Sequence, residues 1–125
     1  RQSPEAKILR MLLKREHILL ISQAIIDQVL RVILRVRNKD FVGLTFHMIW
    51  SDFLVEYVDL ADKKLPQKFR NKVPRKDEAI FLTALAGKAD YLMTNDVEFA
   101  RRASAIQSGF SCVDPKEFLA KKSSK

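Results

Sequence analysis

Cysteine, glycine and long apolar stretches are scarce in this sequence, and each scarcity excludes a class of protein. Cys112 is the only cysteine, so an intrachain disulfide and a four-cysteine zinc site are both impossible. The three glycines stand far apart, which excludes a glycine-rich phosphate-binding loop. No apolar stretch reaches the roughly 18 residues of a membrane span and no signal-peptide pattern is present, so we expect a protein of the reducing cytoplasm without a membrane partner.

The composition is typical of a single globular domain. Hydrophobic residues make up 47% of the 125 residues and charged residues 30%, which is neither the polar bias of a disordered chain nor the apolar excess of a membrane protein. A chain of this length has room for one sizeable core. We therefore expect one domain over residues 1–120, followed by a short basic tail over residues 121–125.

Positive charge exceeds negative charge by a wide margin. The 23 lysines and arginines against 15 acidic residues give a net charge of +8, and such an excess attracts polyanions, nucleic acid first among them. A basic surface that only keeps the protein soluble, or that meets a membrane or an acidic partner, remains an alternative. The candidates for contacts with an RNA backbone are Arg31, Arg35, Arg75 and Lys76. The basic segment 63–76 also fits a solvated loop.

The first half of the chain carries alternating helix and strand patterns. Ser3, Pro4 and Glu5 form a helix-start signature, and the apolar run over residues 17–21 predicts a buried strand. Ser22 then opens a predicted helix to about residue 36, whose wide apolar face predicts that it is largely buried.

A second helical block is predicted over residues 40–61, with a break near Gly43 or Thr45. Its aromatic side chains recur at spacings of three and four residues. Such side chains can stack on nucleic-acid bases, but this spacing is more typical of a core.

The second half of the chain continues the alternation. Asp77 opens a predicted helix that Gly87 ends, because glycine best tolerates the conformation that follows a helix. Then follow a strand over residues 91–93, a helix from Asp96 to about residue 105, a strand over residues 110–113 and a final helix capped by Asp114. Strands that alternate with helices predict an α/β fold with a mostly parallel central sheet and helices on both faces.

Two aspartates are predicted to meet at one edge of this sheet. Sites in α/β sheets lie beyond the carboxyl ends of the strands, where Asp96 falls, and the helix that Asp77 opens leads into the same strand. Carboxylates gathered in one place repel each other unless a hard divalent cation neutralises them, and such an ion can activate water for attack on a phosphodiester. Each aspartate taken alone also fits the role of a helix N-cap.

The segments around both aspartates resemble the PIN-domain family. Residues 74–85, Pro-Arg-Lys-Asp-Glu-Ala-Ile-Phe-Leu-Thr-Ala-Leu, and residues 89–96, Ala-Asp-Tyr-Leu-Met-Thr-Asn-Asp, are similar to the acidic core of that family. In the family, one aspartate starts a helix that ends in alanines and another follows a strand. Residues 20–33 resemble its second strand and helix, and residues 110–119 resemble its closing strand and tail. The resemblance covers almost the whole chain and is most specific over residues 77–96.

The resemblance implies a three-layer PIN-like fold and a metal-dependent endoribonuclease that uses Mg²⁺ or Mn²⁺. It further implies the toxin of a bacterial toxin–antitoxin pair, held in check by an antitoxin protein, and a homodimer. Asp77 and Asp96 are then metal ligands, and the Thr94 hydroxyl orients a carboxylate or a ligand water. Thr94 also fits an ordinary residue at a strand end.

The sequence departs from the family pattern at two places. The family's first strand, which lies in the centre of the sheet and ends in a metal-binding aspartate, has no counterpart. A chain without that strand exposes unpaired strand edges, so we expect roughly fifteen upstream residues to be missing or the protein to be a truncated homologue. Gln28 stands where the family has a glutamate; Asp27 precedes it and is a second candidate ligand that also fits an ion pair with Arg31.

These departures keep two further functions open. One is a degenerate member of the family that binds RNA or a protein partner without cleavage, because its acidic site is incomplete. The other is a scaffold domain that keeps only the fold.

Overall fold

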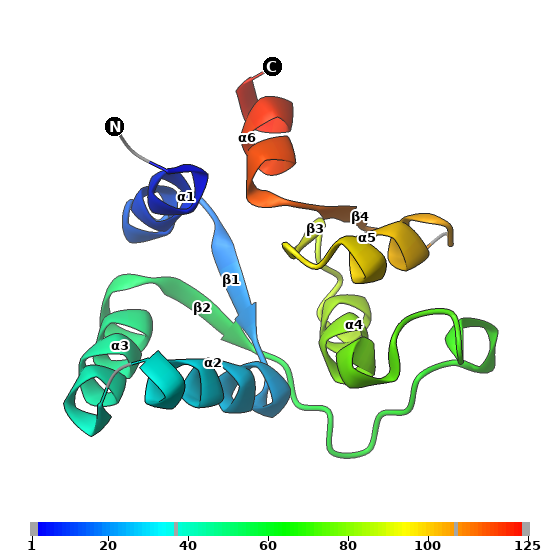
Figure 1. Ribbon diagram of the computed structural model, residues 1–125, viewed down its shortest axis with the longest axis horizontal. Helices are drawn as coiled ribbons and strands as arrows, with labels where there is room; N and C mark the ends of the chain where they lie inside the picture. The colour runs from blue at the N-terminus through cyan, green and yellow to red at the C-terminus, as the bar shows by residue number, and fades with distance from the viewer. Residues whose placement is uncertain (1–2, 37, 107, 124–125) are drawn as a thin grey trace.

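The computed structural model describes residues 3–36, 38–106 and 108–123 of the chain (Figure 1). Helices and strands alternate along it: α1 (Pro4–Leu13), β1 (Ile18–Ile21), α2 (Gln23–Val36), α3 (Lys39–Asp52), β2 (Leu54–Tyr57), the 3₁₀ turns η1 (Gln67–Phe69) and η2 (Arg75–Asp77), α4 (Glu78–Ala86), β3 (Tyr91–Met93), α5 (Val97–Ser104), β4 (Ser111–Val113) and α6 (Pro115–Ser123). The predicted α/β class is confirmed.

The first helix and the first strand lie where the sequence predicts them. Ser3 caps α1, since its Oγ accepts the N–H of Ala6 at 3.1 Å, and Pro4 occupies the first turn. The apolar run that follows forms β1, which ends in the buried Ile21. Ser22, which is fully buried, leads directly into α2.

The helix α2 is more exposed than its apolar pattern predicts. Val32 is 46% exposed and Leu34 49% exposed, whereas Ile33 between them is buried. The expectation that this helix is largely buried is therefore wrong. The helix packs against α3, α4 and β1 on one side, and its other side faces solvent.

The predicted helical block over residues 40–61 is a helix followed by a strand. α3 continues through Gly43 without a break, and at Phe53 the backbone becomes extended and starts β2. The helical prediction for the second part of the block was wrong because the spacing of its aromatics continues past the end of α3. Phe53 and Tyr57 are four residues apart, as on a helix, yet Phe53 is buried in the core and Tyr57 is exposed on a strand.

Glycine is required at position 87, directly after α4, for a steric reason. Its φ is −85°, which any residue adopts, so the left-handed cap that we predicted there is not formed. A Cβ at this position would lie 2.7 Å from Leu20 Cδ1 and 3.0 Å from Val58 Cγ2. Glycine thus allows the end of α4 to approach β1 closely. The positive φ of this turn, 55°, belongs to Lys88.

The last strand and helix follow the prediction. The Asp114 carboxylate accepts the N–H of Glu117 at 2.7 Å, and the Glu117 carboxylate accepts the N–H of Asp114 at 2.9 Å. This reciprocal pair is a capping box, and it fixes the start of α6.

The strands form two parallel two-stranded sheets in place of the single central sheet predicted. β1 pairs with β2 in the register Ile18–Leu54, and β3 pairs with β4 in the register Tyr91–Ser111. Among the described residues no ladder joins β1 to β3. Parallel pairing is therefore confirmed, whereas one continuous sheet is not what the structure shows.

Each sheet has its own apolar core, and a buried hydrogen bond connects the two halves. The core beside β1 contains Ile21, Ile49 and Phe53, and the core beside β3 contains Phe69, Val73, Phe81, Ala84, Leu92, Phe99 and Ala103. Ser22 Oγ lies 2.7 Å from Thr83 Oγ1, and both side chains are almost completely buried. Since Thr83 Oγ1 donates to the Ala79 carbonyl at 2.8 Å, Ser22 is the donor to Thr83.

The helices are all short. The longest, α2 and α3, have 14 residues each. Along the described ranges, no helix has both the length and the apolar character that crossing a membrane requires.

Candidate functional site

β3 brings Thr94 and Asp96 to the carboxyl edge of its sheet. Thr94 N donates to the Val113 carbonyl at 2.9 Å, so the pairing with β4 extends one residue past β3. The Thr94 hydroxyl accepts the N–H of Asp96 at 3.0 Å, and Asp96 Oδ1 accepts the N–H of Phe99 at 3.1 Å. Asp96 is therefore the N-cap of α5, and the Thr94 hydroxyl stabilises the turn that positions it.

Asp77 stands before α4 as Asp96 stands before α5, but it makes no capping hydrogen bond. Its Oδ2 atom is buried and has no hydrogen-bond partner among the described residues. A buried polar atom without a partner costs about 1–3 kcal/mol, so it occurs rarely unless something outside the protein satisfies it. The capping role explains Asp96 and leaves Asp77 unexplained.

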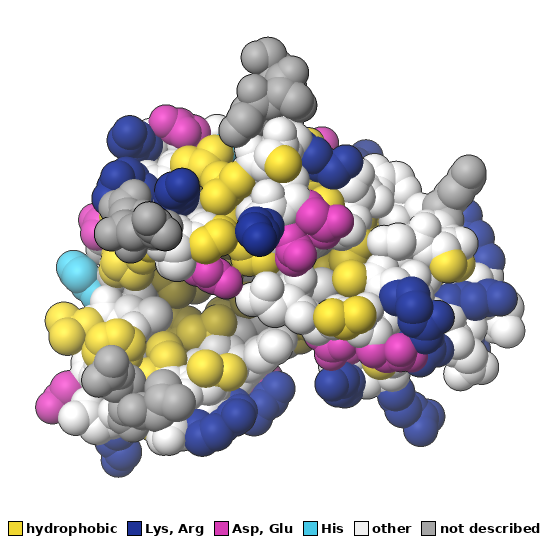
Figure 2. Space-filling view, turned by 45° about the horizontal axis from the view of Figure 1, so that its top comes forward, with side chains coloured by type: hydrophobic (Ala, Val, Ile, Leu, Met, Phe, Trp, Pro, Cys, Tyr) yellow, Lys and Arg dark blue, Asp and Glu magenta, His cyan; other side chains and the backbone are white. Residues whose placement is uncertain are grey.

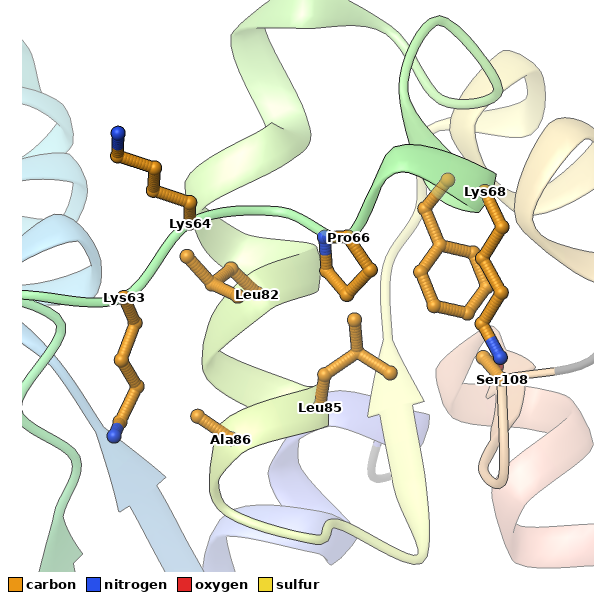
Figure 3. Close-up of a pocket in the computed structure, with 9 residues that line it drawn as sticks. Lys63, Lys64, Pro66, Lys68, Leu82, Leu85, Ala86 and Ser108 are labelled. Carbon is orange, nitrogen blue, oxygen red and sulfur yellow. The ribbon is translucent and has the colours of Figure 1, made fainter.

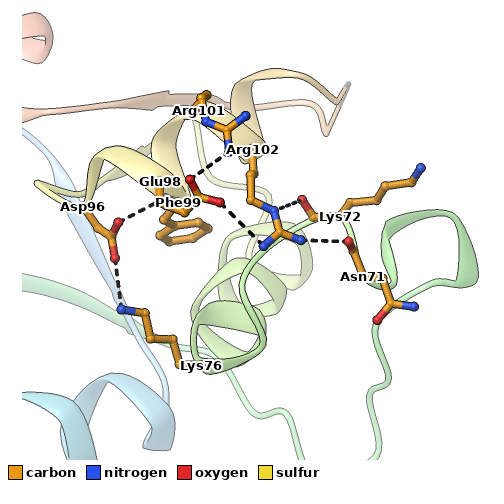
Figure 4. A network of polar contacts seen from close by, with 8 residues as sticks. All are labelled: Asn71, Lys72, Lys76, Asp96, Glu98, Phe99, Arg101 and Arg102. Carbon is orange, nitrogen blue, oxygen red and sulfur yellow. Dashed lines mark hydrogen bonds and ion pairs between the residues drawn. The ribbon is translucent and has the colours of Figure 1, made fainter.

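The charges of these two aspartates interact, and Lys76 acts on both. Burial raises the pKa of Asp77 above its ordinary value; the charge of Lys76 opposes this rise and the charge of Asp96 adds to it. The N–H of Phe99, together with the Lys76 ammonium 3.2 Å from Asp96 Oδ2, lowers the pKa of Asp96 (Figure 4). One carboxyl thus ionises readily beside another whose ionisation is opposed. Because the charge of Asp96 acts on Asp77, the two carboxyls lie near each other.

Asp27 and Gln28 do not join this pair. Both are exposed on α2, and within the described residues no hydrogen bond or ion pair links them to Asp77 or Asp96. Asp27 Oδ1 accepts a hydrogen bond from Gln23 Nε2 at 2.9 Å, in place of the ion pair with Arg31 that the spacing suggested.

The edge that carries Asp77 and Asp96 has few potential metal ligands. Over the described ranges, no group of three or more histidine, cysteine, aspartate or glutamate side chains could hold a metal ion. Asp77 and Asp96 provide two carboxylates, and a complete site needs further oxygen ligands from water, substrate or another segment.

Two residues that were not predicted as site residues, Glu5 and Asn95, lie beside Asp96 or contact its neighbour. Asn95 Nδ2 lies 3.5 Å from Glu5 Oε2, so the start of α1 is beside the end of β3. Glu5 fits the ordinary preference for an acid in the first turn of a helix, and nothing else in the sequence marks it. Only the tertiary packing of α1 brings it here. For Asn95, its place next to Asp96 in the chain is the one available signal.

The residues predicted to contact RNA lie on the surface. Arg31 and Arg35 are exposed on α2, and Arg75 is exposed at the start of η2. Lys76 is 73% exposed and forms its ion pair with Asp96 at the same time. In Figure 2, lysine and arginine side chains gather at the right end and along the lower side of the molecule.

Arg102 fixes the segment that leads to Asp77. Its guanidinium donates to the carbonyls of Asn71 at 2.8 Å and Lys72 at 3.2 Å, and it lies 3.9 Å from Glu98 Oε2 (Figure 4). These contacts hold residues 71–72, in the basic segment 63–76, against α5. The backbone before Asp77 is thereby tied to the helix that Asp96 caps.

A separate cavity of about 470 Å³ lies at the other end of α4. Apolar side chains from α4 and the ring of Phe69 form its floor, and three lysines stand around it: Lys63, Lys64 and Lys68 (Figure 3). No acidic residue lines this cavity, so it can attract an anion but not bind a metal ion. Comparisons of the chain with models of protein families, with curated proteins and with solved structures find no match.

Proposed function

We propose that this protein is a metal-dependent endoribonuclease of the PIN type, with Asp77 and Asp96 as metal ligands. The observation that carries the proposal is the buried, unpartnered Oδ2 of Asp77 beside a second carboxylate. Burial and the charge of Asp96 both oppose the ionisation of Asp77, and a bound cation removes both penalties. Thr94 holds the turn of Asp96 in place and is a positioning residue.

The donor set fits a hard divalent cation in part. Two carboxylates are the ligands that Mg²⁺ and Mn²⁺ prefer, and Mg²⁺ usually keeps several waters or substrate oxygens in its remaining positions. When bound, such an ion activates water and stabilises the charge that develops on a phosphodiester. Water, substrate oxygens or a further acid would complete the set. Asp27 and Gln28 lack contact with the pair and are the weaker candidates.

The basic surface provides a path for the substrate. Arg31, Arg35 and Arg75 are exposed, and a backbone phosphate that replaces Asp96 as the partner of Lys76 would sit next to the acids. The resemblance to the PIN family extends the proposal to a three-layer arrangement of the two sheets, to a homodimer and to regulation by an antitoxin protein in the cytoplasm.

A second candidate is an RNA-binding protein that does not cleave. The ion pair between Lys76 and Asp96 favours it, because the ammonium at 3.2 Å already neutralises one of the two acids. In that case the basic surface binds RNA and the acidic edge needs no metal.

Cleavage of an RNA panel in Mn²⁺ separates the two candidates. The parent is expected to cut, and Asp96→Asn is expected to lose activity while keeping its fold, since asparagine is an equally good N-cap. If Asp96→Asn cuts as well as the parent, the metal site is wrong. RNA binding without cleavage by the parent supports the second candidate.

Direct Mn²⁺ titration by calorimetry tests the role of Lys76. Removal of a cation from Asp96 is expected to tighten Mn²⁺ binding in Lys76→Met by severalfold. Lys72→Met is the matched control, because Lys72 is exposed and its hydrogen bonds to Phe69 and Arg102 use its backbone, which the substitution keeps. Equal affinity in the two variants would show that Lys76 does not compete for the site.

A further inference from the structure

The cavity at the carboxyl end of α4 combines an apolar floor with a basic rim. Leu82, Leu85 and Ala86 of α4 form the floor together with Pro66 and the ring of Phe69. Its volume of about 470 Å³ is within the range of pockets that hold small organic ligands. The floor therefore fits a flat apolar group better than it fits a hydrated ion.

The rim has positive charge without a matching negative charge. Lys63, Lys64 and Lys68 are exposed, and along residues 3–36, 38–106 and 108–123 none of the three forms an ion pair with an acidic side chain. The Lys68 ammonium instead lies 5.0 Å from the centre of the Phe69 ring, which belongs to the floor. An anion that binds here reduces the mutual repulsion of the three cations.

The segment that carries these lysines has a fixed backbone. Phe69 N donates to the Pro66 carbonyl at 2.9 Å. The Arg70 side chain donates to the Leu65 carbonyl at 3.4 Å. The buried Phe69 ring also packs edge-on against the ring of Phe81, with 5.3 Å between the ring centres. The cavity is thus formed before a ligand arrives, so binding does not have to order the backbone.

The cations stand on two sides of the floor. Figure 3 shows Lys63 and Lys64 on one side of the apolar side chains, and Lys68 with Ser108 on the other. An anion with one charged end, such as a fatty acid, meets the cations of one side only. A nucleotide within a nucleic-acid strand has a phosphate on each side of its base, so it matches both sides at once.

We propose that this cavity holds one nucleotide of a single-stranded RNA, with its base on the apolar floor and its two flanking phosphates on the lysines of the two sides. The Ser108 hydroxyl donates to the Phe110 carbonyl at 3.3 Å, so its oxygen can accept a hydrogen bond from the base or from the ribose 2′-hydroxyl.

This subsite deepens the proposed function and rests on RNA as the ligand of the protein. The nine residues of α4, which span about 13 Å, run from Asp77 to the cavity. A strand of a few nucleotides is long enough to reach both. The cavity then holds the RNA at a second point, away from the two aspartates.

Fluorescence anisotropy with a labelled single-stranded RNA of about eight nucleotides tests the rim, in a chelator so that no cleavage is needed. Lys63→Ser combined with Lys64→Ser is expected to weaken binding by about tenfold at low salt, and Lys68→Ser by about threefold. The control combines Lys7→Ser with Lys116→Ser, which removes two charges from exposed positions outside the cavity. It is expected to weaken binding by about twofold or less.

A second pair of variants tests the floor while every lysine stays in place. Ala86→Leu fills part of the cavity and is expected to weaken RNA binding by about fivefold, because the base loses its place. Ala120→Leu is the matched control, since Ala120 is exposed on α6 and lies outside the cavity. Melting temperatures of both variants check that the fold is kept.

Competition against the labelled RNA tests the two-sided arrangement of the cations. A nucleoside 3′,5′-bisphosphate is the smallest probe with a base between two phosphates. It is expected to displace the RNA at a concentration about fivefold lower than a nucleoside 5′-monophosphate, because only the bisphosphate reaches both sides.

Three results would overturn the proposal. Equal weakening by the Lys63 and Lys64 variant and by its control would show that only the net charge attracts RNA. Unchanged RNA affinity of Ala86→Leu would show that no base enters the cavity. Displacement of the bisphosphate, but not of the RNA, by substitutions in the cavity would make a free nucleotide the ligand.

The outcomes for the cavity and for the nuclease are separable. RNA cleavage in Mn²⁺ with unchanged RNA affinity in every cavity variant sinks the subsite and leaves the nuclease standing. Selective loss of RNA affinity in the cavity variants, without any cleavage by the parent, supports the subsite and sinks the nuclease alone.

Discussion

At the scale of single residues, the fold treats the two aspartates differently. Asp96 uses one carboxylate oxygen to cap α5 and the other to pair with Lys76, so its negative charge is stabilised by the protein itself. Asp77 has a buried oxygen with no such partner. The protein thus stabilises the ionised form of Asp96 and destabilises the ionised form of Asp77. We therefore expect the two residues to affect stability in opposite ways as the pH changes.

Asp77→Asn is expected to stabilise the protein at neutral pH in the absence of divalent ions. A folded-state pKa above the ordinary 3.8 means that the native state binds the proton more tightly than the unfolded state. The ionised carboxyl therefore destabilises the parent above that pKa, and the penalty vanishes as the pH falls below 3.8. Thermal denaturation from pH 7 to pH 3 should show the variant's advantage shrinking. With Mn²⁺ present the order should reverse, since only the parent binds the ion.

Asp96 is expected to show the opposite dependence. Its folded-state pKa is lowered, so its contribution to stability is present above 3.8 and is lost as the pH falls through the folded-state value. Asp96→Ala should lower the melting temperature by a few degrees at pH 7, and Asp96→Asn should lower it less, because asparagine loses the charge that pairs with Lys76 but keeps the cap. Equal melting temperatures for the two variants would contradict the capping role.

Sequence reasoning placed the site residues unevenly. Asp77 and Asp96 were predicted at one edge because each precedes a helix beside the same strand, and in the structure the charge of Asp96 acts on the pKa of Asp77. Asp27 was a weaker prediction, because its position relative to the edge depends on the rotation of α2. Glu5 was missed, because its approach to Asn95 joins segments at opposite ends of the chain.

At the scale of elements, α4 connects the two halves of the molecule. Thr83 receives the Ser22 hydroxyl at the end of β1, and one turn later Gly87 lies against Leu20. The helix then turns back into β3. α4 consequently contacts both β1 and β3, and Asp77 is the residue at its amino end.

The close approach of α4 to β1 predicts a cost for a side chain at Gly87. Gly87→Ala is expected to destabilise the protein by about 1–3 kcal/mol through crowding, since the backbone angle itself suits alanine. Gly43→Ala is the matched control. Its Cβ would meet nothing within 4 Å, and within α3 it should stabilise by roughly 0.5–1 kcal/mol. Urea denaturation of both variants measures the contrast, and similar effects for the two would refute it.

The helices and strands were predictable wherever local signals agreed. Caps at Ser3, Asp96 and Asp114 and short apolar runs fixed most boundaries. β2 was missed because its residues continue the aromatic spacing of α3, and local periodicity cannot show that Val55 pairs with Leu19. The exposure of α2 was also beyond local reasoning, since a helix pattern does not reveal how many neighbours are present to cover it.

At the scale of the whole molecule, the net charge of +8 is the property that best indicates the kind of partner, a polyanion. The basic side chains of α2, Arg31 and Arg35, are exposed and contribute to this positive charge. The proposed binding of single-stranded RNA to such a surface would release counterions, so we expect its affinity to fall steeply with salt.

The salt dependence of the affinity distinguishes direct phosphate contacts of Arg31 and Arg35 from a general attraction by the net charge. Arg31→Ser combined with Arg35→Ser is expected to reduce the slope of log affinity against log salt by about 0.7 for each phosphate contact removed. Arg10→Ser combined with Lys14→Ser removes the same charge from exposed positions at α1 and its carboxyl end. It should change the slope less. Equal changes would mean that only the total charge matters.

The fold class followed from the alternation of patterns, but the arrangement of the sheets did not. Parallel pairing was predicted from the helical connections between strands, and both pairs are parallel. A single central sheet requires β1 and β3 to be neighbours, and sequence patterns do not record whether two apolar strands touch. Nor do they show that Phe118 of α6 contacts both His17, just before β1, and Tyr91, at the start of β3.

The unequal connections within the two sheets have a consequence for folding order. β3 and β4 are joined through one helix of eight residues, whereas β1 and β2 are joined through two helices of 14 residues each. Closing the longer loop loses more chain entropy, so the carboxyl-terminal pair should assemble early and the amino-terminal pair late. During synthesis the slower-folding amino-terminal half leaves the ribosome first. Its Ser22 hydroxyl cannot form the hydrogen bond to Thr83 until α4 has been made.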